Sequence, residues 1–101
     1  MPAKEFFDEL ERDVEPDKIR DVDNSYLFEI AGEGRWLVEV RRGTLTVTEG
    51  WEGEADATIS ASSEVFERIV AGTQNPMTAY MTGKLKVSGD VGAALKLQSL
   101  F

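Results

Sequence analysis

The sequence predicts an α+β fold in which helices cover one face of a mostly antiparallel, five-stranded sheet. Three observations predict this class. Apolar side chains alternate with polar ones along several short segments, as half-buried strands require. Amphipathic helical segments stand at both ends of the chain and between the last two strands. Strands and helices are therefore grouped along the chain rather than regularly alternated, which is typical of α+β domains.

The first half of the chain predicts one helix and three strands. The helix runs from about Ala3 to Asp13, because apolar residues recur there at helical spacing: Phe6, Phe7, Leu10 and Val14. Alternation then predicts strands at residues 26–30, 36–41 and 44–48, which tight turns join into an antiparallel meander. Residues 32–34, Gly-Glu-Gly, are interpreted as one of these turns rather than as a phosphate-binding loop.

The middle of the chain predicts a fourth strand and a second helix. The longest irregular connection, residues 49–54, is expected to cross over the sheet to a strand around residues 58–60. Ser62 or Ser63 then caps a helix that Gly72 ends. The buried stripe of this helix consists of Val65, Phe66, Ile69 and Val70.

The C-terminal segment, residues 75–101, predicts a short helix, a fifth strand and a closing helix. Asn75 is a good N-cap, and the proline after it suits the first helical position. Gly83 ends this helix, and residues 84–88 alternate as a half-buried strand. Asp90 caps the closing helix, whose apolar residues occupy more than half of its circumference. We therefore expect the closing helix to cover an apolar surface.

Size and composition limit the possible functions. The 101 residues, 42% of them hydrophobic, predict one domain over residues 1–101. The chain has no cysteine and no histidine, so we expect neither a metal nor a cofactor. A net charge of −8 disfavours binding to nucleic acid and to anionic membranes. Because we see no membrane-spanning run and no signal peptide, we expect a cytoplasmic protein without stable membrane insertion.

The C-terminal segment also carries a family pattern. It resembles the run N-P-x-x-A-[FY]-M-x-G-K-[LI]-K-[VI]-x-G-[DN] of the sterol carrier protein-2 domain, also called the non-specific lipid-transfer protein domain. The matching residues are Asn75, Pro76, Ala79, Tyr80, Met81, Gly83, Lys84, Leu85, Lys86, Val87, Gly89 and Asp90. The family's K-L-x-x-L-F-like ending is matched by Lys96, Leu97, Leu100 and Phe101.

This resemblance implies an apolar cavity between the sheet and the helices. It also implies non-catalytic binding and intracellular transfer of an apolar lipid, such as a fatty acid, a fatty acyl-CoA, a phospholipid or a sterol. We expect the lipid to contact the sheet, the middle helices and the closing helix at Phe28, Trp36, Val38, Leu45, Val47, Phe66, Ile69, Val70, Met77, Tyr80, Met81, Leu95, Leu97, Leu100 and Phe101.

Two other functions remain open at this stage. The closing helix also suits docking on a lipid-metabolising enzyme or on a second copy of the chain, as a homodimer. An isomerase would need a carboxylate in an apolar pocket, whereas acidic residues such as Glu29 and Glu39 fall at polar positions and are expected to face solvent. A basic cluster near the closing helix suits either a ligand head group or an ordinary solvated surface: Lys84, Lys86 and Lys96.

Overall fold

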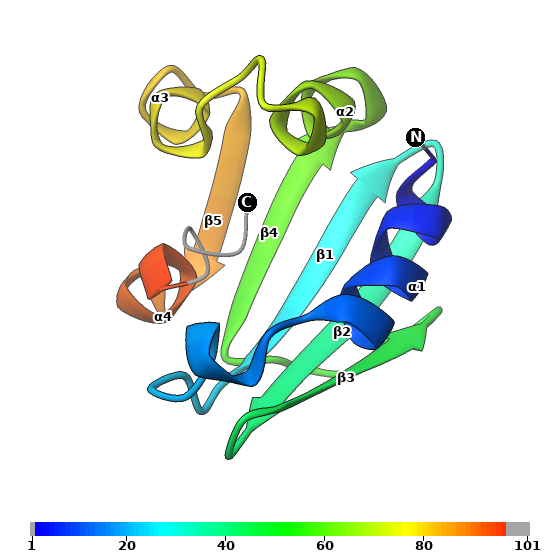
Figure 1. Ribbon diagram of the computed structural model, residues 1–101. Helices are drawn as coiled ribbons and strands as arrows, with labels where there is room; N and C mark the ends of the chain where they lie inside the picture. Colours follow the sequence, from blue (N-terminus) through cyan, green and yellow to red (C-terminus); the bar gives the residue numbers. More distant parts are fainter. Residues whose placement is uncertain (1, 97–101) are drawn as a thin grey trace.

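Five strands form one sheet in the order β3-β2-β1-β4-β5 (Figure 1). In this computed structural model, which describes residues 2–96, β1 pairs parallel with β4 and all other neighbouring strands are antiparallel. The elements are, in chain order, α1 (Ala3–Asp13), a 3-10 turn (Pro16–Lys18), β1 (Ser25–Ala31), β2 (Gly34–Arg41), β3 (Thr44–Glu49), β4 (Ala57–Ser62), α2 (Ser63–Ala71), α3 (Pro76–Met81), β5 (Leu85–Gly89) and α4 (Val91–Lys96). The predicted α+β class and the order of helices and strands are confirmed.

The connection after β3 explains the order of the strands. Residues 50–56 lead from the edge strand β3 past β2 and β1, so that β4 pairs on the far side of β1. β4 therefore runs parallel to β1, as a crossover connection requires. The sheet consists of a first half, β3-β2-β1, and a second half, β4-β5, which meet at the β1–β4 pair.

The helices lie over different halves of the sheet. Figure 1 shows α1 across β2 and β3, whereas α2, α3 and α4 surround β4 and β5. The contacts agree, because α1 packs against β3 and α2, while α3 packs against β5 and α4 against both β4 and β5. α1 therefore covers one part of the space between the helices and the sheet, and α2, α3 and α4 cover the other part.

Phe7 fills the space between α1 and the sheet. Its ring stacks on Trp36 with the ring centroids 5.0 Å apart and on Phe66 at 5.5 Å, and it lies 5.1 Å from the Phe28 ring. Phe7 is fully buried, and Trp36 is 2% exposed. Aromatic pairs of this kind add stabilisation beyond the burial of their area. This cluster fixes α1 to the first half of the sheet.

Three helices, α2, α3 and α4, begin at capping residues that the sequence analysis named, and α2 also ends at one. Ser62, Asn75 and Asp90 each accept hydrogen bonds from backbone N–H groups in the first turn of α2, α3 and α4, at 2.9 to 3.1 Å. Gly72 ends α2 in the left-handed conformation, with φ of 82°. Glycine adopts this conformation without a steric penalty, and its N–H then bonds to the last turn.

The sheet face opposite the helices is partly covered by its own side chains. Leu27 of β1 and Leu37 of β2 are in register on this face, and each is only 3% exposed. Beside them, the Glu29 carboxylate pairs with Arg35 at 2.5 Å and accepts a hydrogen bond from the Ser60 hydroxyl at 3.0 Å. The Glu29 side chain is 36% exposed on this face, and Arg35 lies directly opposite it in the strand register.

Candidate functional site

An apolar pocket lies between the helices and the second half of the sheet. Its volume is about 60 Å³. Except for the Tyr80 hydroxyl and the Met77 sulfur, the side chains that line it are hydrocarbon. The lining residues are Phe28, Ile59, Phe66, Ile69, Pro76, Met77, Tyr80, Leu85, Val87, Val91, Ala94 and Leu95. Such a pocket can bind an apolar group by burial alone.

The floor of the pocket is a row of side chains that crosses three strands. Phe28 of β1 is in register with Ile59 of β4, and Ile59 is in register with Val87 of β5. Leu85 lies two residues before Val87 and therefore on the same face of the sheet. The floor ends at Phe28 because Phe7 covers the next residue of the row, Trp36.

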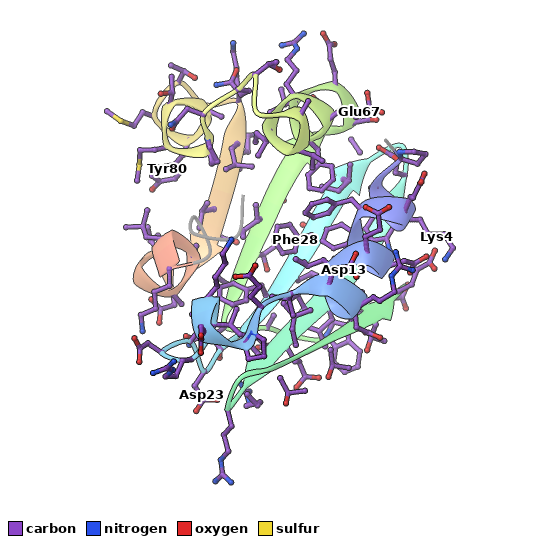
Figure 2. The ribbon with its side chains drawn as sticks, viewed as in Figure 1. Lys4, Asp13, Asp23, Phe28, Glu67 and Tyr80 are labelled. Atoms are coloured by element: carbon purple, nitrogen blue, oxygen red, sulfur yellow. The ribbon has the colours of Figure 1, made fainter. Side chains whose placement is uncertain are left out.

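The α3 helix forms one wall of the pocket. Ala79 is the fully buried residue of this helix, and its small side chain lets the helix lie close to the sheet. The Ala79 carbonyl accepts a hydrogen bond from the Lys84 N–H at 2.8 Å, which ties the helix to the start of β5. Met77 and Tyr80 are three residues apart and share the pocket side of the helix. Figure 2 shows Tyr80 on the side of α3 that faces α4.

The α4 helix forms another wall and is held by a tyrosine from β1. Tyr26 is fully buried, and its hydroxyl donates a hydrogen bond to the Ala93 carbonyl at 2.7 Å. Burial raises the pKa of Tyr26 to about 12, and the negative charges of Asp56 and Asp90 add to this effect. The phenol is therefore a hydrogen-bond donor throughout the physiological pH range, and it holds Ala94 and the other lining residues of α4 over the pocket.

Six of the residues expected to contact lipid line this pocket, and they come from β1, α2, α3 and α4: Phe28, Phe66, Ile69, Met77, Tyr80 and Leu95. The four expected residues of β2 and β3 do not line the pocket and instead belong to the main hydrophobic core or pack against it: Trp36, Val38, Leu45 and Val47. Their alternation correctly places them on the covered face of the sheet. The alternation of apolar and polar residues does not show which helix covers which half of the sheet.

Two of the remaining expected residues do not line the pocket, and three fall outside the described residues. Val70 packs against the main core but is not among the lining residues. Met81 is 78% exposed, because it follows Tyr80 by one residue and so points away from the pocket side of α3. Leu97, Leu100 and Phe101 fall outside the residues that the structure describes.

Six lining residues were not expected: Ile59, Pro76, Leu85, Val87, Val91 and Ala94. Ile59, Leu85 and Val87 were recognised as strand residues, and the parallel pairing of β4 with β1 is what brings them beside Phe28. The sequence signal that could have identified these three residues was the alternation of apolar and polar residues in the last two strands. Combined with the crossover of residues 49–54, it would have placed these strands under the C-terminal helices.

The pocket is small for a lipid site. Sites for small molecules usually measure about 300 to 1,000 Å³, whereas this pocket measures about 60 Å³. An empty apolar space of this size costs about 1.5 kcal/mol, and one of 300 Å³ would cost about 7 kcal/mol, at roughly 24 cal/mol per Å³. A small pocket is therefore more favourable for the unliganded protein than an empty cavity of the usual ligand size.

Residues 2–96 also bear on two other kinds of site. Within this range, no group of histidine, cysteine and acidic side chains has the geometry to hold a metal ion. In the same part of the chain, no helix has the length and apolar character needed to cross a membrane.

The sequence model of the SCP-2 sterol transfer family matches residues 4–101. The chain belongs to this family. The family binds and transfers lipids, and its domain is in general non-catalytic. The match confirms the resemblance first seen in the C-terminal segment, and it extends that resemblance to nearly the whole chain.

Relatives in the SCP-2 sterol transfer family include proteins several times the length of this chain. Hydroxysteroid dehydrogenase-like protein 2 from Xenopus laevis is 34% identical over 98% of this chain, which spans 24% of that protein. Sterol carrier protein 2 from Homo sapiens is 30% identical over 93% of this chain, which spans 19% of that protein. The chain thus spans a quarter or less of these relatives.

A solved structure shows the same fold. The solution structure of palmitated SCP2L2 from Aedes aegypti superposes with a TM-score of 0.80, covers 99% of this chain and 94% of its own, and is 24% identical in sequence. The likeness extends over the sheet and all the helices described above.

Proposed function

We propose that the chain shelters a single apolar lipid chain in the pocket between α2, α3, α4 and the second half of the sheet, and carries it through the cytoplasm. The observation that supports this proposal is the unbroken apolar lining, with the row Phe28, Ile59 and Val87 as its floor. Binding is by burial, without a covalent step. The ligand classes are those expected from the sequence: fatty acid, fatty acyl-CoA, phospholipid or sterol.

Ligand entry requires the pocket to expand, because 60 Å³ holds only a small part of a lipid chain. α3 is the element best suited to move. It is only six residues long, and left-handed glycines flank it at Gly72 and Gly83, with φ of 82° and 80°. The gain on binding is large enough to drive such a movement, since burying about ten methylene groups contributes roughly 8 kcal/mol before the cost of immobilising the chain.

A fatty acyl chain is the ligand that this geometry favours. A narrow pocket that widens along the row of floor residues matches a flexible chain better than a rigid ring system. The palmitated relative from Aedes aegypti has the same fold and supports this choice. We expect affinity in the micromolar range and little selectivity for the head group.

The proposal is tested by extracting purified protein with organic solvent and analysing the extract by mass spectrometry, together with native mass spectrometry of the intact complex. We expect a stoichiometric fatty acid or phospholipid, or saturable uptake of a fluorescent fatty acid by delipidated protein. Delipidated protein that takes up neither a fatty acid nor a sterol would overturn the proposal.

Two matched variants test whether the lipid binds in this pocket. Leu95→Asp puts a carboxylate at the pocket, where Leu95 is 45% exposed, and is expected to weaken fatty acid binding at least tenfold. Trp51→Asp is the control, because Trp51 is 37% exposed, does not line the pocket and receives the same charge. Equal losses in both variants would contradict the assignment of the site.

A further inference from the structure

The lining of the pocket changes from buried to exposed in one direction. Near the centre of the sheet the lining side chains are at most 7% exposed: Phe28, Ile59, Phe66 and Ile69. Beside the edge strand β5, in contrast, Tyr80 of α3 is 36% exposed and Leu95 of α4 is 45% exposed. The pocket therefore has a closed end between α2 and the centre of the sheet, and an open end between α3 and α4.

The α1 helix blocks the closed end. Phe7 of α1 stacks on Trp36, the residue that follows Phe28 in the row across the sheet, with the ring centroids 5.0 Å apart. The Phe7 ring also stacks on Phe66 at 5.5 Å, and Phe7 is fully buried. A lipid chain that enters between α3 and α4 therefore ends at Phe28 and Phe66 and does not continue beneath α1.

The closed end has no polar side chain for a lipid head group. Its four lining side chains are hydrocarbon, and two of them are phenylalanine rings. A carboxylate or a phosphate that leaves water without a hydrogen-bond partner is strongly disfavoured, whereas a methyl end gains free energy in the same place. The charged end of a lipid must therefore remain at the open end.

The open end offers a hydrogen-bond donor to a head group. Tyr80 carries the hydroxyl of the lining, and no residue between 2 and 96 accepts a hydrogen bond from it. The N–H groups of Met77 and Thr78, in the first turn of α3, already donate to the Asn75 side chain. None of the described lining residues is acidic, so the lining does not repel an anionic head group.

We propose that the lipid binds with its terminal methyl group against Phe28 and Phe66 and with its head group between α3 and α4, where an oxygen of the head group accepts a hydrogen bond from Tyr80. This inference rests on the proposed function, because it requires a lipid in the pocket. It adds the direction of the bound chain and a residue that recognises the head group. The ligand class is a lipid whose head group carries an acceptor oxygen, such as a carboxylate or an ester carbonyl.

The direction of the chain can be measured with the protein's own fluorescence. Trp36 of β2 is in register with Phe28 of β1, and neighbouring strands lie about 4.8 Å apart. Trp51 is the other tryptophan and does not line the pocket, so Trp51→Phe leaves Trp36 as the sole tryptophan. Bromine atoms quench tryptophan fluorescence only at short range. A brominated fatty acid therefore reports which of its ends lies beside Phe28.

Trp51→Phe protein is saturated with long-chain fatty acids that carry bromine either near the terminal methyl group or near the carboxyl group. We expect the first acid to quench Trp36 strongly and the second to quench it weakly. Equal quenching, or stronger quenching by the acid brominated near its carboxyl group, would overturn the proposed direction while the proposed function stands. Failure of both acids to bind would overturn the proposed function, and this inference with it.

Tyr80→Phe tests the contact with the head group. The affinity for a fatty acid is expected to fall roughly three- to tenfold, as the loss of one hydrogen bond predicts. The control ligand is an alkyltrimethylammonium ion of the same chain length, whose head group has no acceptor, and its affinity should stay unchanged. Equal losses for both ligands would mean that Tyr80 acts by packing, and an unchanged affinity for the fatty acid would place the head group elsewhere. Either result would overturn the assignment of Tyr80.

Discussion

Tyr26 of β1 links the sheet to α4, a wall of the pocket, through a hydrogen bond. Its ring is fully buried in the main core, and its hydroxyl reaches the Ala93 carbonyl at 2.7 Å. Within its described residues α4 buries only Ala93, and this hydrogen bond adds to its contacts with β4 and β5. Tyr26 therefore controls the position of the pocket wall without being part of the lining.

Replacing Tyr26 with phenylalanine is expected to lower the free energy of unfolding by about 1 to 3 kcal/mol, because the buried Ala93 carbonyl loses its donor. Urea denaturation measures this change, and hydrogen exchange should show faster opening of α4. Tyr80→Phe is the matched control, since the Tyr80 side chain is 36% exposed and should change stability by less than about 0.5 kcal/mol. Similar effects in the two variants would contradict this role of Tyr26.

The same tyrosine gives a prediction about alkaline pH. Folding raises the pKa of Tyr26 from its ordinary 10.0 to about 12, chiefly through burial. The stabilisation is therefore complete below pH 10 and is lost as the pH rises toward 12. We expect the stability difference between the unchanged protein and Tyr26→Phe to shrink over this interval, which urea midpoints at several pH values would show. A constant difference would mean that Tyr26 titrates alike in the folded and unfolded chain.

Glu33 joins three elements through one carboxylate. It lies in the β1–β2 turn and accepts hydrogen bonds from the Ser63 hydroxyl at 2.6 Å and from the Ala3 N–H at 2.8 Å. These bonds lower the pKa of Glu33, with the Ser63 bond as the larger cause. Pro2, the N-cap of α1, makes no side-chain cap, so Glu33 supplies the cap from another part of the chain.

Glu33→Gln is expected to cost about 1 kcal/mol of stability at neutral pH, because the charged acceptor at two helix N-termini is lost. Since folding lowers this pKa, the contribution is present above the ordinary value of 4.5 and disappears as the pH falls through the folded value. Thermal unfolding of both proteins between neutral and acidic pH measures the difference. The exposed Glu52→Gln is the control, and a gap for Glu33→Gln that persists in acid would contradict the carboxylate's role.

At the scale of elements, α3 and α4 cover the pocket but bury little apolar area against the sheet. α3 is six residues long and buries only Ala79, and the described part of α4 buries only Ala93. Small buried residues bring the helices close to the sheet and leave the pocket nearly closed, but they bury little apolar area. Helices held in this way can separate from the sheet at low cost, as entry of a lipid chain requires.

A substitution that fills the pocket is expected to raise the stability of the protein and to weaken its lipid binding. Ala94→Leu adds three carbons beside a space of about 60 Å³ and is expected to raise the free energy of unfolding by about 1 kcal/mol. The same change should weaken fatty acid binding, because the added side chain occupies the place of the ligand. Ala71→Leu, at an exposed position of α2, is the control and should leave binding unchanged. Greater stability without weaker binding would place the lipid elsewhere.

The sequence predicted the elements well because their signals are local. Asn75, Asp90 and Gly72 identify helix boundaries through one or two local hydrogen bonds or a single backbone angle, and these signals need no knowledge of the rest of the molecule. The 3-10 turn at Pro16–Lys18 was not predicted, because three residues give too short a pattern.

At the scale of the whole molecule, the site could be predicted only in part. Alternation showed that Trp36 and Phe28 both face the helices, and the structure places them side by side in one row. Phe7 stacks on Trp36, and its position decides that Trp36 contributes to the core under α1 while Phe28 lines the pocket. This contact joins residues 29 positions apart, and no pattern within a strand or helix reports it.

The meeting of the two halves of the sheet at β1 and β4 has a consequence for how the chain folds. β1, β2 and β3 are joined by short turns and can pair as soon as they are formed, whereas β4 must close a long loop before it meets β1. Contacts between distant parts of a chain form slowly. The parallel pairing of β1 with β4 is therefore expected to form in the rate-limiting step. Because the floor of the lipid pocket includes residues of both strands, the pocket acquires its shape only in that step.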